Sequence, residues 1–326
     1  MPKFSFKTGR TILLALLGVG FIISFFAPSL MDEYIQLIVM YTLINVILSA
    51  SLNLVNGYMG EFSVGHAGFM AIGAYTSAVL TANALPHAFY SFPVAVVAGG
   101  FFAALAGAAV GFASFKTRGD YLAIVTLAFG MIVKSAIENI DSIGGPRGFL
   151  GIPKLSTMPW VFFWTILTLW VIRNFVYSAH GRSVTAIRED EIAAELSGVN
   201  TRKAKMLAFT ISAFFTGVGG ALFAHLLQFI TPRSFDILKS TDILVMVYLG
   251  GVSSILGSVA GAVVFTALTE ILRPLGVWRM VFMPLILVLL MLFRRRGLFG
   301  MKELSWLVPK RDLPSKRVRG VKHAAS

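Results

Sequence analysis

The residues of this chain best suited to chemistry lie in a glycine-broken, partly polar stretch, GEFSVGHAGFMAIGAY, at residues 60–75. It holds one carboxylate, Glu61, and one imidazole, His66, between long apolar runs. Catalysis would need a nucleophile with a base, or several metal ligands together. The chain has no cysteine, and its four other histidines are scattered without ligand spacing: His87, His180, His225 and His323. Contact with a passing solute is therefore the better interpretation than an enzyme active site.

Glycines in this stretch let the chain depart from a helix and let backbones approach closely. Broken helix at membrane depth is tolerated only where it is buried in protein or lines a cavity. Transporters use such breaks to aim half-helix ends at a substrate. The stretch and its polar neighbours therefore define a candidate translocation path, which consists of Asn45, Asn53, Asn56, Gly60, Ser63, Gly65, His66, Tyr75, Lys134 and Glu138.

A polar stripe precedes the stretch. Asn45, Ser49, Asn53 and Asn56 are spaced by four, four and three residues, which places them on one helical face. Amides facing lipid would lack hydrogen-bond partners, so this face is expected to look into protein or a water-filled path. Hydrogen bonding between helices and lining of the path are both open interpretations.

Ionisable residues inside a membrane are costly and are candidate functional sites. Lys134 and Glu138 are four residues apart in one apolar run and can pair with each other. Glu270 and Arg273 fall near the end of a later run and are expected at the membrane interface. For each of them, structural pairing and substrate contact are both open.

The elements that carry these residues are apolar runs. Of the 326 residues, 56% are hydrophobic and only 13% are charged, so lipid must be the solvent for most of the chain. About 20 apolar residues span a bilayer as a helix. The sequence predicts an all-α polytopic membrane protein with about ten such runs, at 11–31, 34–56, 64–83, 92–115, 120–140, 158–177, 204–230, 241–256, 257–275 and 278–293. The eighth run is short, which leaves a re-entrant segment open.

Charge predicts the orientation. The net charge is +13, and 20 of the 28 Lys and Arg fall in four segments that ten spans would place on one side. These segments are the N-terminal arm, the turn at 116–118, the loop 178–205 and the tail. By the positive-inside rule both termini are predicted to be cytoplasmic.

The chain is expected to divide into three parts. Residues 1–10 form a basic cytoplasmic arm and residues 11–293 a transmembrane domain, which includes a cytoplasmic loop at 178–203. Residues 294–326 form a basic tail, interpreted as an anchor near anionic lipid and not as a nucleic-acid-binding arm.

The cytoplasmic loop leads into the stretch AIREDEIAAELSGVNTRKAKMLAFTISA at 186–213. It is predicted to form a polar helix, a Gly-Val-Asn turn and a basic entry into the seventh span, a shape suited to docking into a partner. The chain has no G-x-x-x-x-G-K-[ST] phosphate loop. If transport is driven by ATP, the ATPase must therefore be another subunit.

Four blocks together resemble one known family, the permeases of branched-chain amino acid ABC importers. They are SLNLVNGYMGEFSVGHAGFMAIGAY at 51–75, GGPRGFLGIP at 144–153, AIREDEIAAELSGVNTRKAKMLAFTISAFFTGVGGALFAH at 186–225 and VYLGGVSSILGSVAGA at 247–262. The resemblance runs from about residue 34 to RRRGLFG at 294–300.

The resemblance implies a transport subunit of the bacterial inner membrane that is not itself an enzyme and binds no cofactor. Its expected partners are a second homologous permease, two cytoplasmic subunits that bind ATP and a periplasmic substrate-binding protein, with no nucleic acid. The cargo would be Leu, Ile or Val.

The loop resembles the coupling motif E-A-A-x-x-x-G of such permeases. Ile192 occupies the glutamate position, with Glu191 adjacent. Many members also carry an acidic residue where Met131 stands, so Lys134 with Glu138 is expected to replace that charge pair. The expected ATPase-coupling residues are Arg188, Glu189, Asp190, Glu191, Ala193, Ala194 and Gly198.

Two other interpretations compete. Similar permeases serve urea, short amides or other amino acids, and a binding protein absent from this sequence largely sets that choice. A secondary carrier or channel independent of ATP would instead need paired repeats or intramembrane carboxylates for ion coupling. Only Glu138 lies deep in a predicted span, and no clear repeat is found.

Overall fold

The computed structural model describes residues 31–84, 90–116 and 121–278, together with residues 24–25, 281, 285 and 297–298. Over these residues the fold is helical, with one isolated β-bridge and no longer strand. The α-helices are α2 (Glu33–Asn53), α3 (His66–Val79), α4 (Ser91–Ser114), α5 (Tyr121–Glu138), α6 (Met158–Val176), α7 (Ala179–Glu189), α8 (Glu191–Leu196), α9 (Thr201–Leu227), α10 (Ile237–Gly250) and α11 (Ile255–Ile271). Short π and 3-10 turns are η1 (Leu54–Met59), η2 (Leu80–Ala84), η3 (Asp141–Ile143), η4 (Gly145–Arg147), η5 (Pro232–Phe235) and η6 (Arg273–Trp278).

Five helices within the described ranges are long and apolar enough to cross a membrane: α2 with its continuation η1, α4, α5, α6 and α9. They correspond to the runs predicted at 34–56, 92–115, 120–140, 158–177 and 204–230. The run predicted at 64–83 is the α3–η2 helix. The all-α polytopic membrane fold is thereby confirmed.

The predicted boundary between the eighth and ninth runs is wrong. The sequence placed it at residues 256–257, which fall inside α11, whereas the break lies between the end of α10 at Gly250 and the start of α11 at Ile255. The two helices are bent by 120° at this break. They therefore form either one broken span or a re-entrant pair, and do not provide two full spans.

The first and last predicted runs, at 11–31 and 278–293, lie almost wholly outside the described residues. So do the basic arm at 1–10 and the tail at 294–326. The number of ten spans thus stays a prediction.

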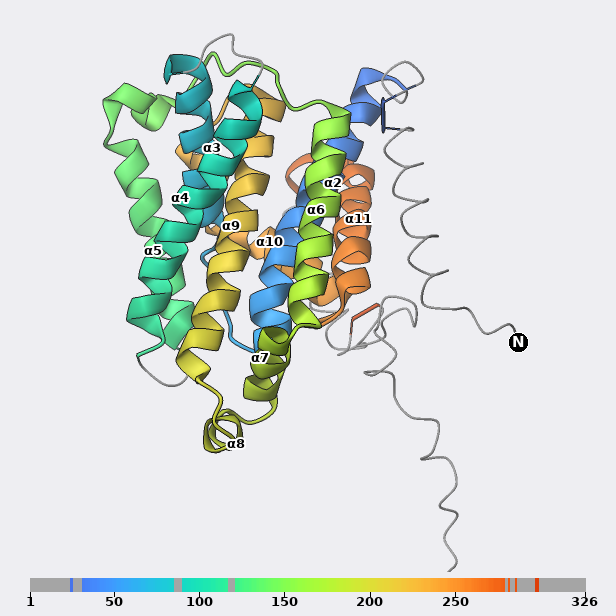
Figure 1. The fold of residues 1–326 in the computed structure, drawn as a ribbon. Helices are drawn as coiled ribbons and strands as arrows, with labels where there is room; N and C mark the ends of the chain where they lie inside the picture. The colour runs from blue at the N-terminus through green and yellow to red at the C-terminus, as the bar shows by residue number, and fades with distance from the viewer. Residues whose placement is uncertain are drawn as a thin grey trace, which may run out of the picture.

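Small residues allow the central helices α3, α4 and α9 to pack closely on one another (Figure 1). A Cβ on Gly73 of α3 would lie 2.1 Å from the carbonyl oxygen of Gly217 on α9. A Cβ on Gly99 of α4 would lie 2.7 Å from Gly73 O. Lipid gives apolar helices no hydrophobic drive to associate, so such close backbone approach supplies the packing energy.

The two ends of the bundle differ. Helices α7 and α8 protrude at one end, and the loop 141–157 covers the opposite end (Figure 1). That loop is tied down by an antiparallel bridge, in which Phe149 N–H donates to Ile230 O over 2.8 Å. Gly148, at φ +87°, brings the loop backbone against Ile230 O. Turn glycines thus hold an ordered loop here.

Candidate functional site

The first helix break separates α2 from α3. The last turn of α2 widens into the π-helical turn η1, and Gly60 then takes a left-handed φ of +78°. Residues 61–65 run without helix until α3 starts at His66. The side chain of Asn56 holds this segment, because it accepts from Ser63 N–H over 3.1 Å and its amide donates to Ser63 O over 3.4 Å. The glycine-broken stretch is therefore a partly buried interruption of helix, in which Ser63 and Gly65 are buried and Phe62 is exposed.

The second break separates α10 from α11. Gly251 (φ +129°) and Ser253 (φ +62°) both have positive φ here. Asn53, at the end of α2, accepts from Ser253 N–H over 2.9 Å and donates to Ser254 O and Ser258 Oγ, each over 2.8 Å. One buried amide therefore joins the second break to the helix that ends at the first.

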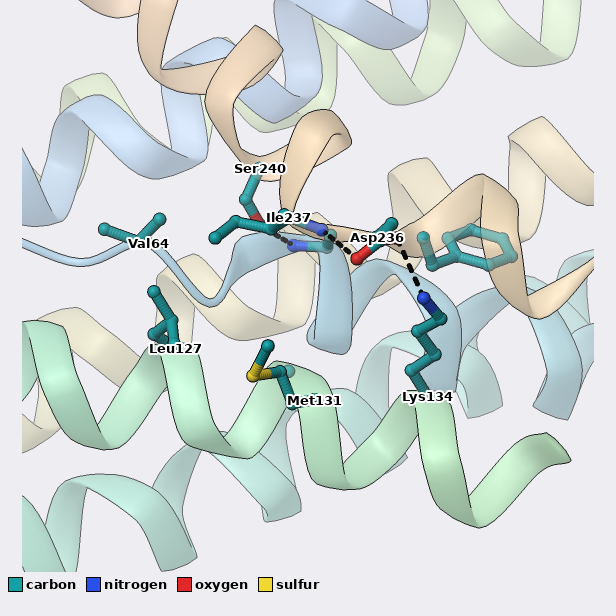
Figure 2. A pocket seen from close by; sticks show the side chains of 10 residues that line it. Val64, Leu127, Met131, Lys134, Asp236, Ile237 and Ser240 are labelled. Atoms are coloured by element: carbon teal, nitrogen blue, oxygen red, sulfur yellow. Dashed lines mark hydrogen bonds and ion pairs between the residues drawn. The ribbon is translucent and has the colours of Figure 1, made fainter. Parts of the chain in front are cut away.

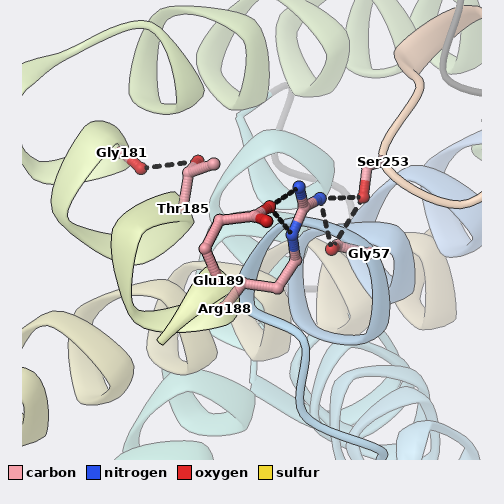
Figure 3. Close-up of polar contacts among 6 residues, drawn as sticks. All are labelled: Gly57, Gly181, Thr185, Arg188, Glu189 and Ser253. Carbon is pink, nitrogen blue, oxygen red and sulfur yellow. Dashed lines mark hydrogen bonds and ion pairs between the residues drawn. The ribbon is translucent and has the colours of Figure 1, made fainter. Parts of the chain in front are cut away.

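Arg188 connects the surface helix α7 to both breaks (Figure 3). Its Nη1 donates to Ser253 Oγ over 2.5 Å and to Gly57 O over 3.3 Å, and Ser253 Oγ donates to Gly57 O over 2.8 Å. A Cβ on Gly60 would lie only 2.5 Å from Arg188 Cγ, so a glycine is needed where this side chain crosses the first break. The neighbouring Glu189 carboxylate pairs with the guanidinium.

Lys205 makes a second connection at the same end of the molecule. Its Nζ lies 2.6 Å from Glu61 Oε1 in the first break and 2.8 Å from Glu191 Oε1 at the start of α8. The lysine and Glu61 side chains are only 8% and 19% exposed, so solvent screens this contact little, whereas the Glu191 side chain is 39% exposed. One ammonium thereby joins α8, α9 and the broken segment.

Capping side chains define the surface helix pair. Asp190 ends α7 and caps α8 by accepting from Ala193 N–H over 3.0 Å. Gly198, at φ +83°, makes the turn after α8, and a Cβ there would meet nothing within 4 Å. Two apolar side chains of α8, Ile192 and Leu196, are 66% and 85% exposed. The predicted helix and turn are thus found as two short helices with an uncovered apolar face.

The polar stripe makes contacts between helices. Asn45 donates to Thr266 Oγ1 of α11 over 3.0 Å, and Asn53 and Asn56 hold the two breaks as described above. Ser49 is fully buried. The interpretation of the stripe as interhelical hydrogen bonding is thereby confirmed for Asn45 and Asn53, whereas Asn56 bonds to the non-helical segment and lining of a translocation path stays a prediction.

Two other predicted path residues lie along α3. His66 is buried, and its Nε2 lies 3.0 Å from Ser212 Oγ of α9. Tyr75, further along the same helix, is also buried and packs edge-to-face against Phe235. Gly65 lies close against α5, because its Cβ would be 2.2 Å from Thr126 O.

Lys134 does not pair with Glu138 as the sequence predicted. Its Nζ lies 2.8 Å from Asp236 Oδ2 at the start of α10. Sequence reasoning considered only the i, i+4 neighbour and did not single out Asp236, although a carboxylate before an apolar helical run is a recognisable cap signal. The sequence also did not lead us to name Ser253 or Lys205 as residues that contact α7 and α8.

Among the described residues, no group of three or more His, Asp or Glu side chains is placed to hold a metal ion. Partly buried helix breaks within a bundle of apolar helices are a feature of membrane transport proteins. The fold and the site therefore define a polytopic membrane permease.

Comparison with known proteins gives the family. Residues 34–293 match the family described as branched-chain amino acid transport system, permease component, and the chain belongs to this family. It is 35% identical to the high-affinity branched-chain amino acid transport system permease protein LivM of Escherichia coli, over 80% of this chain and 68% of that one. The LivM protein of Salmonella typhimurium is 34% identical over 86% of this chain and 72% of its own.

A more distant relative is the permease protein LivH of Salmonella typhimurium, which carries the same system description. It is 22% identical over 67% of this chain and 78% of its own. No solved structure shows significant similarity to the chain.

Proposed function

We propose that this chain is a permease subunit of an ATP-driven importer for Leu, Ile and Val, and that α7 and α8 transmit the movement of separate ATPase subunits to the helix breaks. The observation that carries the proposal is the pair of connections made by Arg188 and Lys205. Each joins the surface helices to backbone that has left helical geometry. Both LivM relatives are named for branched-chain amino acid transport, which supports this cargo.

The proposed assembly has two homologous permeases, two ATP-binding subunits and a periplasmic binding protein in the bacterial inner membrane. LivH supports a second permease, since it resembles this chain and bears the name of the same system. The exposed Ile192 and Leu196 offer α8 as the docking surface for an ATPase. The excess of basic residues in the arm, the loop and the tail supports cytoplasmic termini and ten spans.

Transport would proceed by alternating access. ATP supplies free energy only through the difference in its subunits' contacts with the inward-facing and outward-facing states. When docking moves α8, Lys205 would pull Glu61 and the segment before α3, while Arg188 would pull the loop before α11. Both breaks would then move with the surface pair and change access to the path.

The test is ATP hydrolysis and leucine uptake in proteoliposomes that hold this chain, the second permease, the ATPases and the binding protein. Gly198→Arg places a bulky cation at the docking turn, and Gly198→Ala is the matched control that carries only the strain of positive φ. Ligand-stimulated hydrolysis and uptake should both be lost in the arginine variant and persist in the alanine variant.

Uptake that persists in the arginine variant, or without any ATPase, would contradict the proposal and favour an ATP-independent carrier. If ATP hydrolysis responds to urea and not to leucine, ATP-coupled transport would be supported, but the transported substrate would be urea instead of a branched-chain amino acid.

A further inference from the structure

A small pocket lies where α3, α5 and the start of α10 meet (Figure 2). Its volume is about 20 Å³. Two charged side chains line it, Lys134 and Asp236, and the rest of the wall is mostly apolar. The apolar side chains include Leu127, Met131, Phe235 and Ile237.

The two oxygens of the Asp236 carboxylate have different partners in this pocket. Asp236 Oδ1 accepts from Ile237 N–H over 2.7 Å and so is held as the cap of α10. Its other oxygen, Oδ2, receives Lys134 Nζ over 2.8 Å. The two side chains are 24% and 36% exposed, so neither charge is sealed in the protein interior.

An α-amino acid carries a carboxylate and an ammonium on one carbon, together with its side chain. We propose that this pocket binds a zwitterionic, branched α-amino acid, whose carboxylate pairs with Lys134 and whose ammonium replaces the lysine at Asp236 Oδ2. The alkyl side chain would then lie against Leu127, Met131 and Ile237. This inference rests on the proposed function, because it assigns the cargo a place in the permease.

Charge balance explains why such a site can lie in an apolar bundle. An unpaired ion is costly there, whereas a neutral pair is tolerated. Lys134 and Asp236 neutralise each other in the empty pocket, and a zwitterion neutralises both when it separates them. A solute with one charge would leave either Lys134 or Asp236 without a partner, so the pocket discriminates against it.

The pocket must open to admit an amino acid, because about 20 Å³ holds roughly one water molecule. Helix α5 is suited to move, since only Leu122, Thr126 and Ile137 of its residues are buried. The pocket also adjoins the first helix break, because Val64 lines it and donates through its N–H to Thr126 Oγ1 over 3.2 Å. Movement of residues 61–65, which are joined to Lys205 through Glu61, would therefore displace Val64 and change the shape of this pocket.

The test measures binding of radiolabelled leucine to the assembled transporter in lipid nanodiscs without the binding protein. The competitors are isocaproate, which lacks the ammonium, and isoamylamine, which lacks the carboxylate. Wild type should bind leucine about tenfold or more tightly than either analogue, since each lacks one charge-assisted contact.

The variants should then reverse this preference in opposite directions. Lys134→Met should weaken leucine binding about tenfold or more. It should leave isoamylamine binding unchanged, because the ammonium of isoamylamine still pairs with Asp236. Asp236→Asn should weaken leucine similarly and retain isocaproate, whose carboxylate still meets Lys134. Arg273→Gln removes an exposed ion pair to Glu270 elsewhere and should bind all three ligands as wild type does.

The proposal is overturned if both neutral variants keep wild-type leucine affinity, or if they assemble but lose all three ligands alike. If a variant fails to assemble, the wild-type measurements test the proposal. The proposal is overturned if wild type does not bind leucine, or if either analogue displaces bound leucine as well as unlabelled leucine does. Uptake driven by ATP is measured in parallel. Normal uptake without the reversal defeats only this inference, whereas the reversal without ATP-coupled uptake defeats only the proposed function.

Discussion

Lys205 Nζ lies 2.6 Å from Glu61 Oε1, although 144 residues separate them in the sequence. The same ammonium lies 2.8 Å from Glu191 Oε1 at the start of α8. A surface helix, the long central helix α9 and the non-helical segment before α3 thus share one cation. Displacement of any one of them must either carry the others along or break a largely buried ion pair.

Arg188 should not be replaceable by lysine. The guanidinium reaches Ser253 and Gly57 at once, and a lysine ammonium cannot reproduce this forked geometry. Arg188→Lys should lower the rate of leucine uptake in proteoliposomes by about threefold to tenfold, which corresponds to the net loss of about one ordinary hydrogen bond. Arg182→Lys on the same helix is the control, because Arg182 is exposed and contacts only the nearby Tyr177 O among described partners. Equal rates for the two variants would show that the contacts to the breaks do not matter for transport.

Asn53→Ala should destabilise the permease. The change removes one acceptor and two donated hydrogen bonds, and it leaves Ser253 N–H without that acceptor. The expected loss is about 1–3 kcal/mol in the free energy of unfolding. Thermal unfolding in detergent measures this effect against Asn139→Ala, whose exposed amide bonds only within its own helix turn. Similar melting temperatures for both variants would refute the structural role of Asn53.

Leu196→Glu should weaken association with the ATPase subunits without destabilising the permease. Leu196 is 85% exposed, so a charge there loses little packing within this chain but would place a carboxylate in an apolar contact. The amount of ATPase that copurifies with a tagged permease gives the result, and a severalfold loss is expected. Leu150→Glu, 72% exposed in the loop at the opposite end, should leave copurification unchanged. A loss in both variants would argue against α8 as the docking surface.

Much of the fold was predictable, because backbone in lipid must satisfy its own hydrogen bonds and therefore forms long apolar helices. The interruption between Gly60 and Gly65 was also predictable, since glycines separate polar residues there from the runs on either side. The break between Gly250 and Ile255 was missed by a few residues. Its residues Gly251, Val252, Ser253 and Ser254 are mostly small or polar, a turn signal that the boundary drawn from apolar runs did not use.

The contacts of the candidate site were less predictable. Sequence spacing pairs neighbours on one helix, so it proposed Glu138 for Lys134, whereas the partner Asp236 is brought near only when α5 packs beside α10. Arg188 was named as part of the coupling loop, yet its contact with Ser253 depends on a positive φ in a different part of the chain. Such pairings follow from tertiary packing and leave no local pattern.

The measurement that tests the central claim most directly is the number of leucine molecules imported per ATP hydrolysed by Lys205→Met. The claim predicts that the variant still assembles with its ATPases and hydrolyses ATP, while the ratio falls about tenfold, because Glu61 and Glu191 no longer share a cation. Lys203→Met, two residues away at the exposed start of α9, should keep the wild-type ratio. An unchanged ratio in Lys205→Met would contradict the claim that the surface helices drive the helix breaks through this ion pair.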